Sequence, residues 1–214
     1  MKKIFLAAIL LIFAACGNGN AEIFTEETPP VAAEETTEPP LWERVHLGGL
    51  DWIVLAEAEG KRLILSEGVI KRAAFSNDYS VMWQTSLVRE YLNGAFFYDN
   101  FAQDERSRIV ETQVTNSPNP TYGTGGGENT QDRVFLLCLD EIAALMRDGT
   151  VLDAARVAHY LGDGSSAWWW LRSTGYSSDF AAIVRADGSV RTDGRGAEII
   201  HGGVRPVLWL EVNQ

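Results

Sequence analysis

Three consecutive tryptophans constrain the fold of this chain more than any other stretch of its sequence. In an extended strand, alternate side chains face opposite sides, so Trp168 and Trp170 would share one face and Trp169 would lie on the other. A segment with large apolar side chains on both faces suits a central strand between two apolar layers. Three adjacent tryptophans are not easily all buried, so we expect at least one of them to be partly exposed.

A second tryptophan-bearing segment, Gly202–Leu210, is expected to pair with the tryptophan strand and to build the core with it. The two segments carry Arg172 and Arg205. Each guanidinium could tie loops together by donating to carbonyls or to a carboxylate such as Asp132 or Glu90, because its donors form a planar fork. Alternatively, it could present this fork to a ligand carboxylate or sulfate.

These two segments also supply the candidate ligand-binding residues. Exposed tryptophan commonly stacks on sugars or anchors a protein partner. The candidates are Trp168, Trp169, Trp170, Arg172 and Arg205. Replacing whichever tryptophan is exposed should leave folding intact.

The first residues of the chain have the pattern of an export signal. A basic pair precedes the apolar run Ile4–Phe13, and two alanines precede Cys16. The run is shorter than the ~20 residues that span a bilayer, as is typical of a secretory signal peptide. Small residues directly before a cysteine resemble the bacterial lipobox. This resemblance implies that residues 1–15 are a lipoprotein signal peptide and that a lipid on Cys16 anchors the protein outside a membrane. The alternative is ordinary secretion, with Cys16 as a bystander.

Residues 16–40 have the composition of a disordered tether. From Gly17 to Pro40 the chain has six glutamates, four prolines and no basic residue. Low hydrophobicity with charge of one sign cannot offset the entropy lost on ordering, and proline and self-repulsion extend such a chain. Residues 41–214 are sufficient for one globular domain with a single core.

The charge balance bears on the partners of this domain. The chain has 29 Asp and Glu against 18 Lys and Arg, without a basic cluster. Nucleic acid selects surfaces rich in Lys and Arg, so we expect no nucleic-acid partner. Direct docking on anionic lipid headgroups is disfavoured for the same reason.

The globular part is expected to be α+β, with mainly antiparallel strands, few short helices and long loops. Its first element is a three-stranded meander over 42–66, with turns at Gly48-Gly49 and Glu59-Gly60. A helix over 83–93 would follow, capped by Thr85 or Ser86 and ended by Asn93-Gly94. The remaining predicted elements are an aromatic cluster over 96–101, a short helix starting at Asp104, a strand over 109–115, a loop over 116–132, a buried strand over 134–139, a helix over 140–146, a helical turn over 156–161 and a hairpin over 181–191.

Several segments together resemble one family. In chain order they are Trp52–Leu55, Leu63–Ser66, Trp83 with Ser86–Asn93, Phe96-Phe97, Asp132–Leu137, Trp169–Ser173 and Gly203–Pro206. The pattern W-W-L-R-S followed by G-V-R-P resembles an uncharacterised bacterial domain family, of unknown function, found in surface lipoproteins and secreted proteins. Cys138 stands where this family often has serine, and Thr174 where it often has proline. The G-V-R-P segment is more remotely similar to the C-type-lectin-like fold, which includes the formylglycine-generating enzymes, and this implies a C-type-lectin-like architecture.

We expect no catalytic residues, no metal and no cofactor. Formylglycine-generating enzymes use two reactive cysteines, whereas here only Cys138 could serve, and it lies in an apolar run where a thiol is expected to be inert. The histidines, His46, His159 and His201, do not have the spacing of a metal site. Two sets of carboxylates leave alternatives open. They are Asp78 with Asp99 as a glycosidase-like pair, and Asp163, Asp179, Asp187 or Asp193 as calcium ligands, although Asp beside Gly or Ser usually bonds its own backbone in a turn.

The sequence therefore predicts a non-catalytic binding domain whose ligand is a glycan, a cell-wall polymer or a protein of the envelope. One alternative is a divergent enzyme on a formylglycine-generating-enzyme-like fold, which a pocket with a converging acid and base would favour. The other is a structural component of an envelope assembly, which a large flat apolar face would favour. An exposed aromatic patch without an acid–base pair favours binding.

Overall fold

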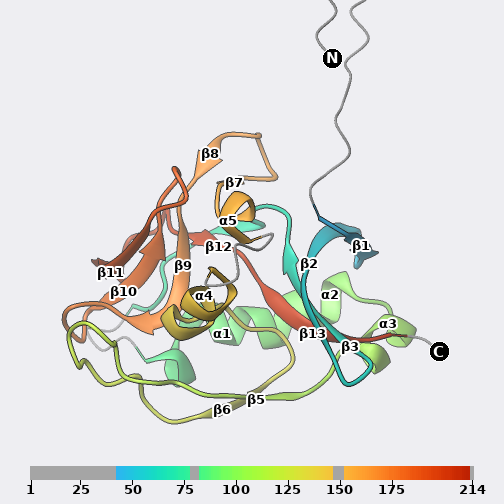
Figure 1. Ribbon diagram of the computed structural model, residues 1–214, viewed down its shortest axis with the longest axis horizontal. Helices are drawn as coiled ribbons and strands as arrows, with labels where there is room; N and C mark the ends of the chain where they lie inside the picture. Colours follow the sequence, from blue (N-terminus) through green and yellow to red (C-terminus); the bar gives the residue numbers. More distant parts are fainter. Residues whose placement is uncertain (1–41, 78–81, 147–151, 213–214) are drawn as a thin grey trace, which may run out of the picture. The chain divides into compact units, whose positions relative to one another are not determined.

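Two sheets form the framework of the domain (Figure 1). The computed structural model describes residues 42–77, 82–146 and 152–212, all within one compact unit. The four-stranded sheet contains, in spatial order, β1 (Arg44–Leu47), β2 (Leu50–Ala58), β3 (Lys61–Ser66) and β13 (Val207–Glu211). The five-stranded sheet contains β11 (Val190–Gly196), β10 (Phe180–Val184), β9 (Trp169–Thr174), β12 (Gly203–Val204) and β4 (Lys71–Arg72).

Two small strand pairs complete the β structure. They are β5 (Thr112–Val114) with β6 (Thr130–Asp132), and β7 (Ala158–His159) with β8 (Ser166–Ala167). Among the described ladders, only the pairing of β12 with β9 is parallel.

The helices are short. They are η1 (Trp83–Thr85), α1 (Leu87–Tyr91), η2 (Leu92–Phe96), α2 (Phe97–Asn100), α3 (Gln103–Arg108), α4 (Leu139–Met146) and α5 (Leu152–Ala155). The helices α1 to α3 run along one side of both sheets (Figure 1). Within the described ranges, no helix has the length and apolar character needed to cross a bilayer. The predicted α+β class, with mostly antiparallel strands, few short helices and many loops, is confirmed.

The predicted meander forms because its turns suit tight hairpins. A type I′ turn, a two-residue turn that matches strand twist, needs positive φ at both central positions. Gly48 and Gly49 have φ of 59° and 70°, and Glu59 and Gly60 have φ of 51° and 72°. Both turns lie where the sequence places them, and they fix the registers of β1, β2 and β3.

The helix predicted over 83–93 starts as expected but continues beyond the predicted end. The Ser86 Oγ accepts a hydrogen bond from the backbone N–H of Arg89 at 3.1 Å and caps α1. The backbone then passes through a π turn, in which Gly94 takes φ −106° and ψ −110°. One residue with non-helical geometry kinks the helix instead of ending it, so the following aromatic turn stays helical.

Three predicted elements differ from the structure, and one of them is the loop predicted over 116–132, which ends in strand β6. Residues 134–139 are buried, as predicted, but Phe135 alone forms a bridge, to Val207, because neighbouring backbone groups bond to other partners. Residues 156–161, predicted as a helical turn, include β7 instead. There the backbone of His159 and Leu161 bonds to Val69, so long-range pairing overrides local helical preference.

The second tryptophan-bearing segment is divided between the sheets. As predicted, Gly203 in β12 lies beside Trp169 in β9, but β13 joins the other sheet beside β3. The chain changes sheets at Arg205-Pro206, and Figure 1 shows this passage in red between the two sheets. Proline cannot donate to a ladder, so Pro206 suits the position between the two strands.

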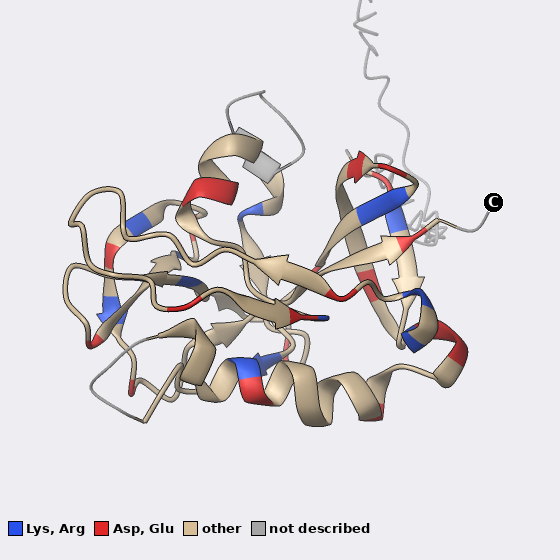
Figure 2. Cartoon of the chain, turned by 90° about the horizontal axis from the view of Figure 1, so that it is seen from below, with Lys and Arg blue, Asp and Glu red and all other residues tan. Residues whose placement is uncertain are grey.

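Charged residues are interspersed over the domain. Figure 2 shows blue and red segments mixed among the elements. On the four-stranded sheet, Arg62 pairs with Glu43 at 2.7 Å and with Glu57 at 2.6 Å, and Arg44 pairs with Glu67. Such exposed pairs contribute little to stability, but they neutralise much of the local charge.

Candidate functional site

Trp169 and Trp170 lie on β9, Trp168 directly precedes it, and the three rings alternate as an extended chain predicts. The rings of Trp168 and Trp170 share one face, edge to face, with centroids 4.8 Å apart. Trp169 lies on the other face, where the Arg205 guanidinium carbon is 5.1 Å from its ring centroid. Trp169 and Trp170 are fully buried, whereas Trp168 is half-buried. Of the three, Trp168 alone offers ring surface to a ligand.

The buried indole N–H groups both donate to backbone carbonyls. The Nε1 of Trp170 donates to Ala73 O at 2.9 Å, and the Nε1 of Trp169 donates to Arg156 O at 3.0 Å. These bonds satisfy the polar atoms of two large core side chains, as buried polar groups require. They also fix the position of Trp170, against which Trp168 packs.

Arg205 ties together the two segments in which the chain passes from one sheet to the other, between β3 and β4 and between β12 and β13. It is fully buried, and it donates to Ser66 O and Glu67 O at 2.9 Å each and to Ala155 O at 2.5 Å. Burial lowers the pKa of the Arg205 guanidinium to about 9, so the group remains charged at pH 7. Three backbone carbonyls therefore accept from the guanidinium nitrogens that a ligand would otherwise use. This geometry favours the alternative in which Arg205 ties loops together.

Arg172 has a comparable position. It is 3% exposed, and its terminal nitrogens donate to both carboxylate oxygens of Glu141 at 2.6 and 2.7 Å, and to Leu136 O and Thr115 O. A bidentate pair of this kind adds geometric specificity to the ion pair. The carboxylate partner is Glu141, not the Asp132 or Glu90 that the sequence suggested.

Glu141 also caps α4 together with Cys138. Its Oε2 accepts from the Cys138 backbone N–H at 2.9 Å, while the Cys138 Sγ accepts from the Glu141 N–H at 3.4 Å. This is the reciprocal arrangement of a capping box, with cysteine in the position of serine. Burial, and then the Glu141 charge, raise the pKa of the Cys138 thiol to about 11. A protonated, buried thiol is a poor nucleophile, in line with the expected inert role.

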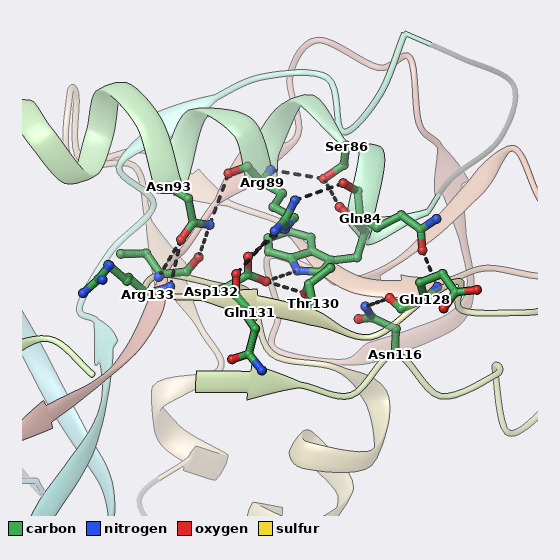
Figure 3. A network of polar contacts seen from close by, with 12 residues as sticks. Gln84, Ser86, Arg89, Asn93, Asn116, Glu128, Thr130, Gln131, Asp132 and Arg133 are labelled. Carbon is green, nitrogen blue, oxygen red and sulfur yellow. Dashed lines mark hydrogen bonds and ion pairs between the residues drawn. The ribbon is translucent and has the colours of Figure 1, made fainter. Parts of the chain in front are cut away.

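A polar network centred on Asp132, between two other segments that carry the family resemblance, also supports the fold. The fully buried Asp132 carboxylate accepts from Trp83 Nε1 at 2.8 Å, from Arg89 Nε at 2.7 Å and from Thr130 Oγ at 2.6 Å (Figure 3). Figure 3 also shows Asn93 bonded to the backbone beside Arg133. The network joins α1 to β6 and leaves Asp132 without accessible oxygens.

Trp168 lines a pocket of about 190 Å³ together with Arg72, Ser166, Ala167 and His201. Arg72 comes from β4, Ser166 and Ala167 from β8, and His201 from the turn between β11 and β12. Three separate segments therefore meet at this pocket: β4, residues 166–168 and the turn that carries His201. The pocket presents a guanidinium, a hydroxyl and an imidazole beside that ring.

Two further side chains support the pocket. The Arg195 guanidinium carbon lies 4.9 Å from the Trp168 ring centroid. The Arg72 guanidinium carbon lies 4.4 Å from the Tyr160 ring centroid, and Arg72 donates to Ser165 Oγ at 2.6 Å. Sequence reasoning identified Trp168 but missed Arg72, Arg195 and Tyr160, because no motif links residues on separate elements.

Two other hollows are less suited to recognition. The larger one, about 230 Å³, lies beside Trp209 and is lined by Lys61, Glu59 and Glu111 among others. The other, about 200 Å³, lies between β4 and α1, where Lys71 covers the Tyr91 ring at 3.9 Å. The first sets the donors Lys61 and Thr112 beside the carboxylates of Glu59 and Glu111, and the second is mostly apolar. The Trp168 pocket differs in that its described lining combines an aromatic ring with donors and contains no carboxylate.

The histidines and the loop carboxylates occupy separate positions. His46 pairs with Asp51 at 2.8 Å, His159 Nδ1 is 3.2 Å from Gly164 O, and His201 alone lines the Trp168 pocket. In the part of the chain that the structure describes, no three His, Cys, Asp or Glu side chains gather as a metal site would require. Asp78, one member of the proposed glycosidase-like pair, lies outside the described residues.

The candidate calcium ligands are engaged in turns or ion pairs. Asp163 accepts from Ser165 N and Asp187 from Ser189 N, each at 2.9 Å. The further pairs are Asp179 with Ser177 Oγ and Asp193 with Arg191. Bonds to Ser165 lower the pKa of Asp163, and bonds to Ser189 lower that of Asp187. These contacts match the turn role that the sequence favoured over calcium binding.

Fold and site together define an α+β domain with a small pocket beside the half-buried Trp168. The family model described as Domain of unknown function (DUF6273) matches residues 59–212, and the chain therefore belongs to this family. The match extends from the β2–β3 turn through β13. It therefore includes both the tryptophan strand β9 and Arg205, where the chain passes from β12 to β13. Neither a curated protein nor a solved structure matches the chain.

Proposed function

We propose that this protein is a membrane-anchored extracytoplasmic lipoprotein whose domain binds a glycan of the cell envelope without converting it. The observation that carries the proposal is the pocket of Trp168, Arg72, Ser166, Ala167 and His201. An aromatic face beside hydrogen-bond donors is an arrangement suited to a ring with an apolar face and polar edges. The ring is held in place by Trp170, so the pocket is formed before a ligand arrives.

The absence of a converging acid–base pair in this pocket supports binding over catalysis. General acid–base chemistry needs a donor and an acceptor within reach of the same substrate bond. His201 is a candidate for one of these roles, but neither Asp nor Glu is among the described residues that line the pocket. A partly exposed aromatic side chain without an acid–base pair favours a binding module over an enzyme.

The location of the protein rests on its first forty residues, which lie outside the described ranges. The signal-like run before Cys16 and the acidic tether over 16–40 support export and a lipid anchor. The C-type-lectin-like architecture belongs to the same proposal, supported by the Gly203–Pro206 segment. An experimental structure of the domain, superposed on that fold, tests it.

The test of the proposed function is a binding screen of the full chain against envelope glycan and peptidoglycan fragments, with and without calcium. We expect saturable binding that is lost in Trp168→Ala. The matched control is Trp209→Ala, which removes the half-buried tryptophan of the other sheet and should retain binding. Far-ultraviolet circular dichroism checks that both variants fold.

Two results would contradict the proposal. Binding lost in Trp209→Ala but kept in Trp168→Ala would move the site to the other sheet. An absence of binding to any fragment, in either condition, would reject the glycan ligand and direct the search to protein partners of the envelope.

A further inference from the structure

We infer that the Trp168 pocket selects a sugar that carries a carboxylate. This inference rests on the proposed function, because it assumes that the pocket binds a glycan, and it adds the charge of the sugar. Three observations support it: the hydrogen-bond donors that line the pocket, the donors that Arg72 still has available, and the position of Arg195 beside the Trp168 ring.

The pocket lining offers donors without anionic acceptors. Its ionisable side chains are Arg72 and His201, and no described lining residue is Asp or Glu. Guanidinium and hydroxyl groups donate hydrogen bonds, and the guanidinium cannot accept one. A ligand of neutral hydroxyls would leave this donor excess poorly matched, whereas a carboxylate accepts from several donors at once.

Arg72 is held in position, and its ion pair with Asp163 is a long one. The Tyr160 ring and Ser165 Oγ hold its guanidinium, at 4.4 Å and 2.6 Å. Its nearest carboxylate oxygen, on Asp163, is 3.6 Å from Nη1, which is beyond a good hydrogen bond. Asp163 is itself bonded to the N–H of Ser165 at 2.9 Å. A guanidinium has five N–H donors, so Arg72 retains donors for a ligand.

Arg195 adds a second positive charge beside the same ring. Its guanidinium lies against Trp168, and among the described residues no carboxylate forms an ion pair with it. The chain as a whole has a formal net charge of −11. A locally basic pocket on an acidic protein attracts an anionic group while the rest of the surface repels it.

The size of the pocket limits what enters it. Its volume of about 190 Å³ is below the roughly 300–1,000 Å³ of sites for drug-sized ligands. One sugar ring, at a chain end or as a side group, is therefore the unit recognised. The sugar ring stacks on Trp168, and the sugar carboxylate accepts hydrogen bonds from Arg72.

The experiment compares matched sugars that differ only in the carboxylate-bearing group, by titration calorimetry on the full chain. The pairs are methyl β-glucuronide with methyl β-glucoside, and N-acetylmuramic acid with N-acetylglucosamine. We expect at least one acidic member to bind about tenfold or more tightly than its neutral partner, as for a hydrogen bond to a charged group. The preference should fall as salt is raised.

Variants separate the charge from the ring. Arg72→Gln should abolish the acidic preference and keep weak binding of both members, whereas Trp168→Ala should lose both. Arg195→Gln provides the same test if Arg72→Gln does not fold, with a smaller loss of preference expected. The control is Arg185→Gln, which removes an exposed arginine outside the pocket and should leave the preference unchanged.

The outcomes distinguish this inference from the function on which it rests. Equal affinity for the acidic and neutral members overturns the carboxylate preference but leaves glycan binding in place. An undiminished preference in both Arg72→Gln and Arg195→Gln also overturns it. If no acidic sugar binds, the inference fails, and the fragment screen decides separately whether the protein binds glycans.

Discussion

At the scale of single residues, Glu141 stands out because it meets two requirements with one carboxylate. It caps α4 through the Cys138 N–H and pairs with Arg172 on the tryptophan strand. The start of the helix is thereby fixed to the centre of the five-stranded sheet. Removing Glu141 would leave a buried guanidinium without its anion, and an unpaired buried charge is strongly destabilising.

The Cys138 thiol gives a pH-dependent prediction at this scale. Its pKa is raised from 9.0 to about 11 by burial and by the Glu141 charge, so the folded state holds this proton more tightly than the unfolded chain. Its contribution to the free energy of unfolding is therefore complete below pH 9 and lost as pH rises through 11. We expect a loss of about 3 kcal/mol at most, measured by urea unfolding from pH 8 to 11.

The control is Cys138→Ser, which keeps an acceptor at the helix cap and removes the titrating thiol. It should unfold much like the wild type at pH 8 and lose less stability by pH 11. Parallel loss in the two proteins would show that the thiol does not cause the change. Iodoacetamide gives a second readout, since it should label Cys138 only after unfolding.

At the scale of elements, the packing of β9 depends on a glycine in another segment. A Cβ on Gly202 would lie 1.9 Å from Trp170 Nε1, and that nitrogen is held by its bond to Ala73 O. Neither group can move without disturbing the core, because Trp170 also packs on Phe75 with ring centroids 5.8 Å apart. The tryptophan strand and the turn before β12 are thus mutually dependent.

Gly202→Ala should therefore destabilise the domain by about 1–3 kcal/mol, as for overpacking in a core, measured by denaturant unfolding. The matched control is Gly125→Ala, where a Cβ meets nothing within 4 Å and φ is not positive. That variant should change stability by no more than about 0.5 kcal/mol. Equal effects of the two substitutions would contradict the packing argument.

The elements also show which features a sequence can predict. The first hairpins were predictable because their signals are local: Gly48-Gly49 and Glu59-Gly60 favour tight turns. The division of 202–210 between two sheets was missed, although Pro206 within the run was a readable signal against one continuous strand. The pairing of β7 was unpredictable from its own residues, because its partners lie in β8 and at Val69.

The candidate site was only partly predictable for a similar reason. Strand alternation predicts that Trp168 and Trp170 share a face, but not which ring stays accessible. Which ring stays accessible depends on two segments that pack over the tryptophans, 73–76 and 197–202, and both are remote from them in sequence. Arg72 and Arg195 approach Trp168 only through the fold, so composition and motifs could not identify them.

At the scale of the whole molecule, the proposed anchor gives a prediction that is independent of the pocket. Cys16→Ser should release the protein from the membrane fraction and abolish labelling with a radioactive fatty acid, because one lipidated residue supplies the attachment. Cell fractionation and immunoblotting measure this. The control is Cys138→Ser, which should stay with the membrane. Retention of the Cys16→Ser protein in that fraction would contradict the lipid anchor.

The arrangement of the last two described strands has a consequence for biosynthesis. Because β12 lies between β9 and β4, and β13 borders β3, neither sheet can be completed until residues 203–211 have been made. Ribosomes produce a chain from its N-terminus, so β3 and β4 must wait without these neighbours through most of translation. The nascent domain therefore cannot complete its two sheets early. Any chain that stops before Gly203 lacks the strand between β9 and β4, and it also lacks Arg205, which bonds to the carbonyls of Ser66, Glu67 and Ala155.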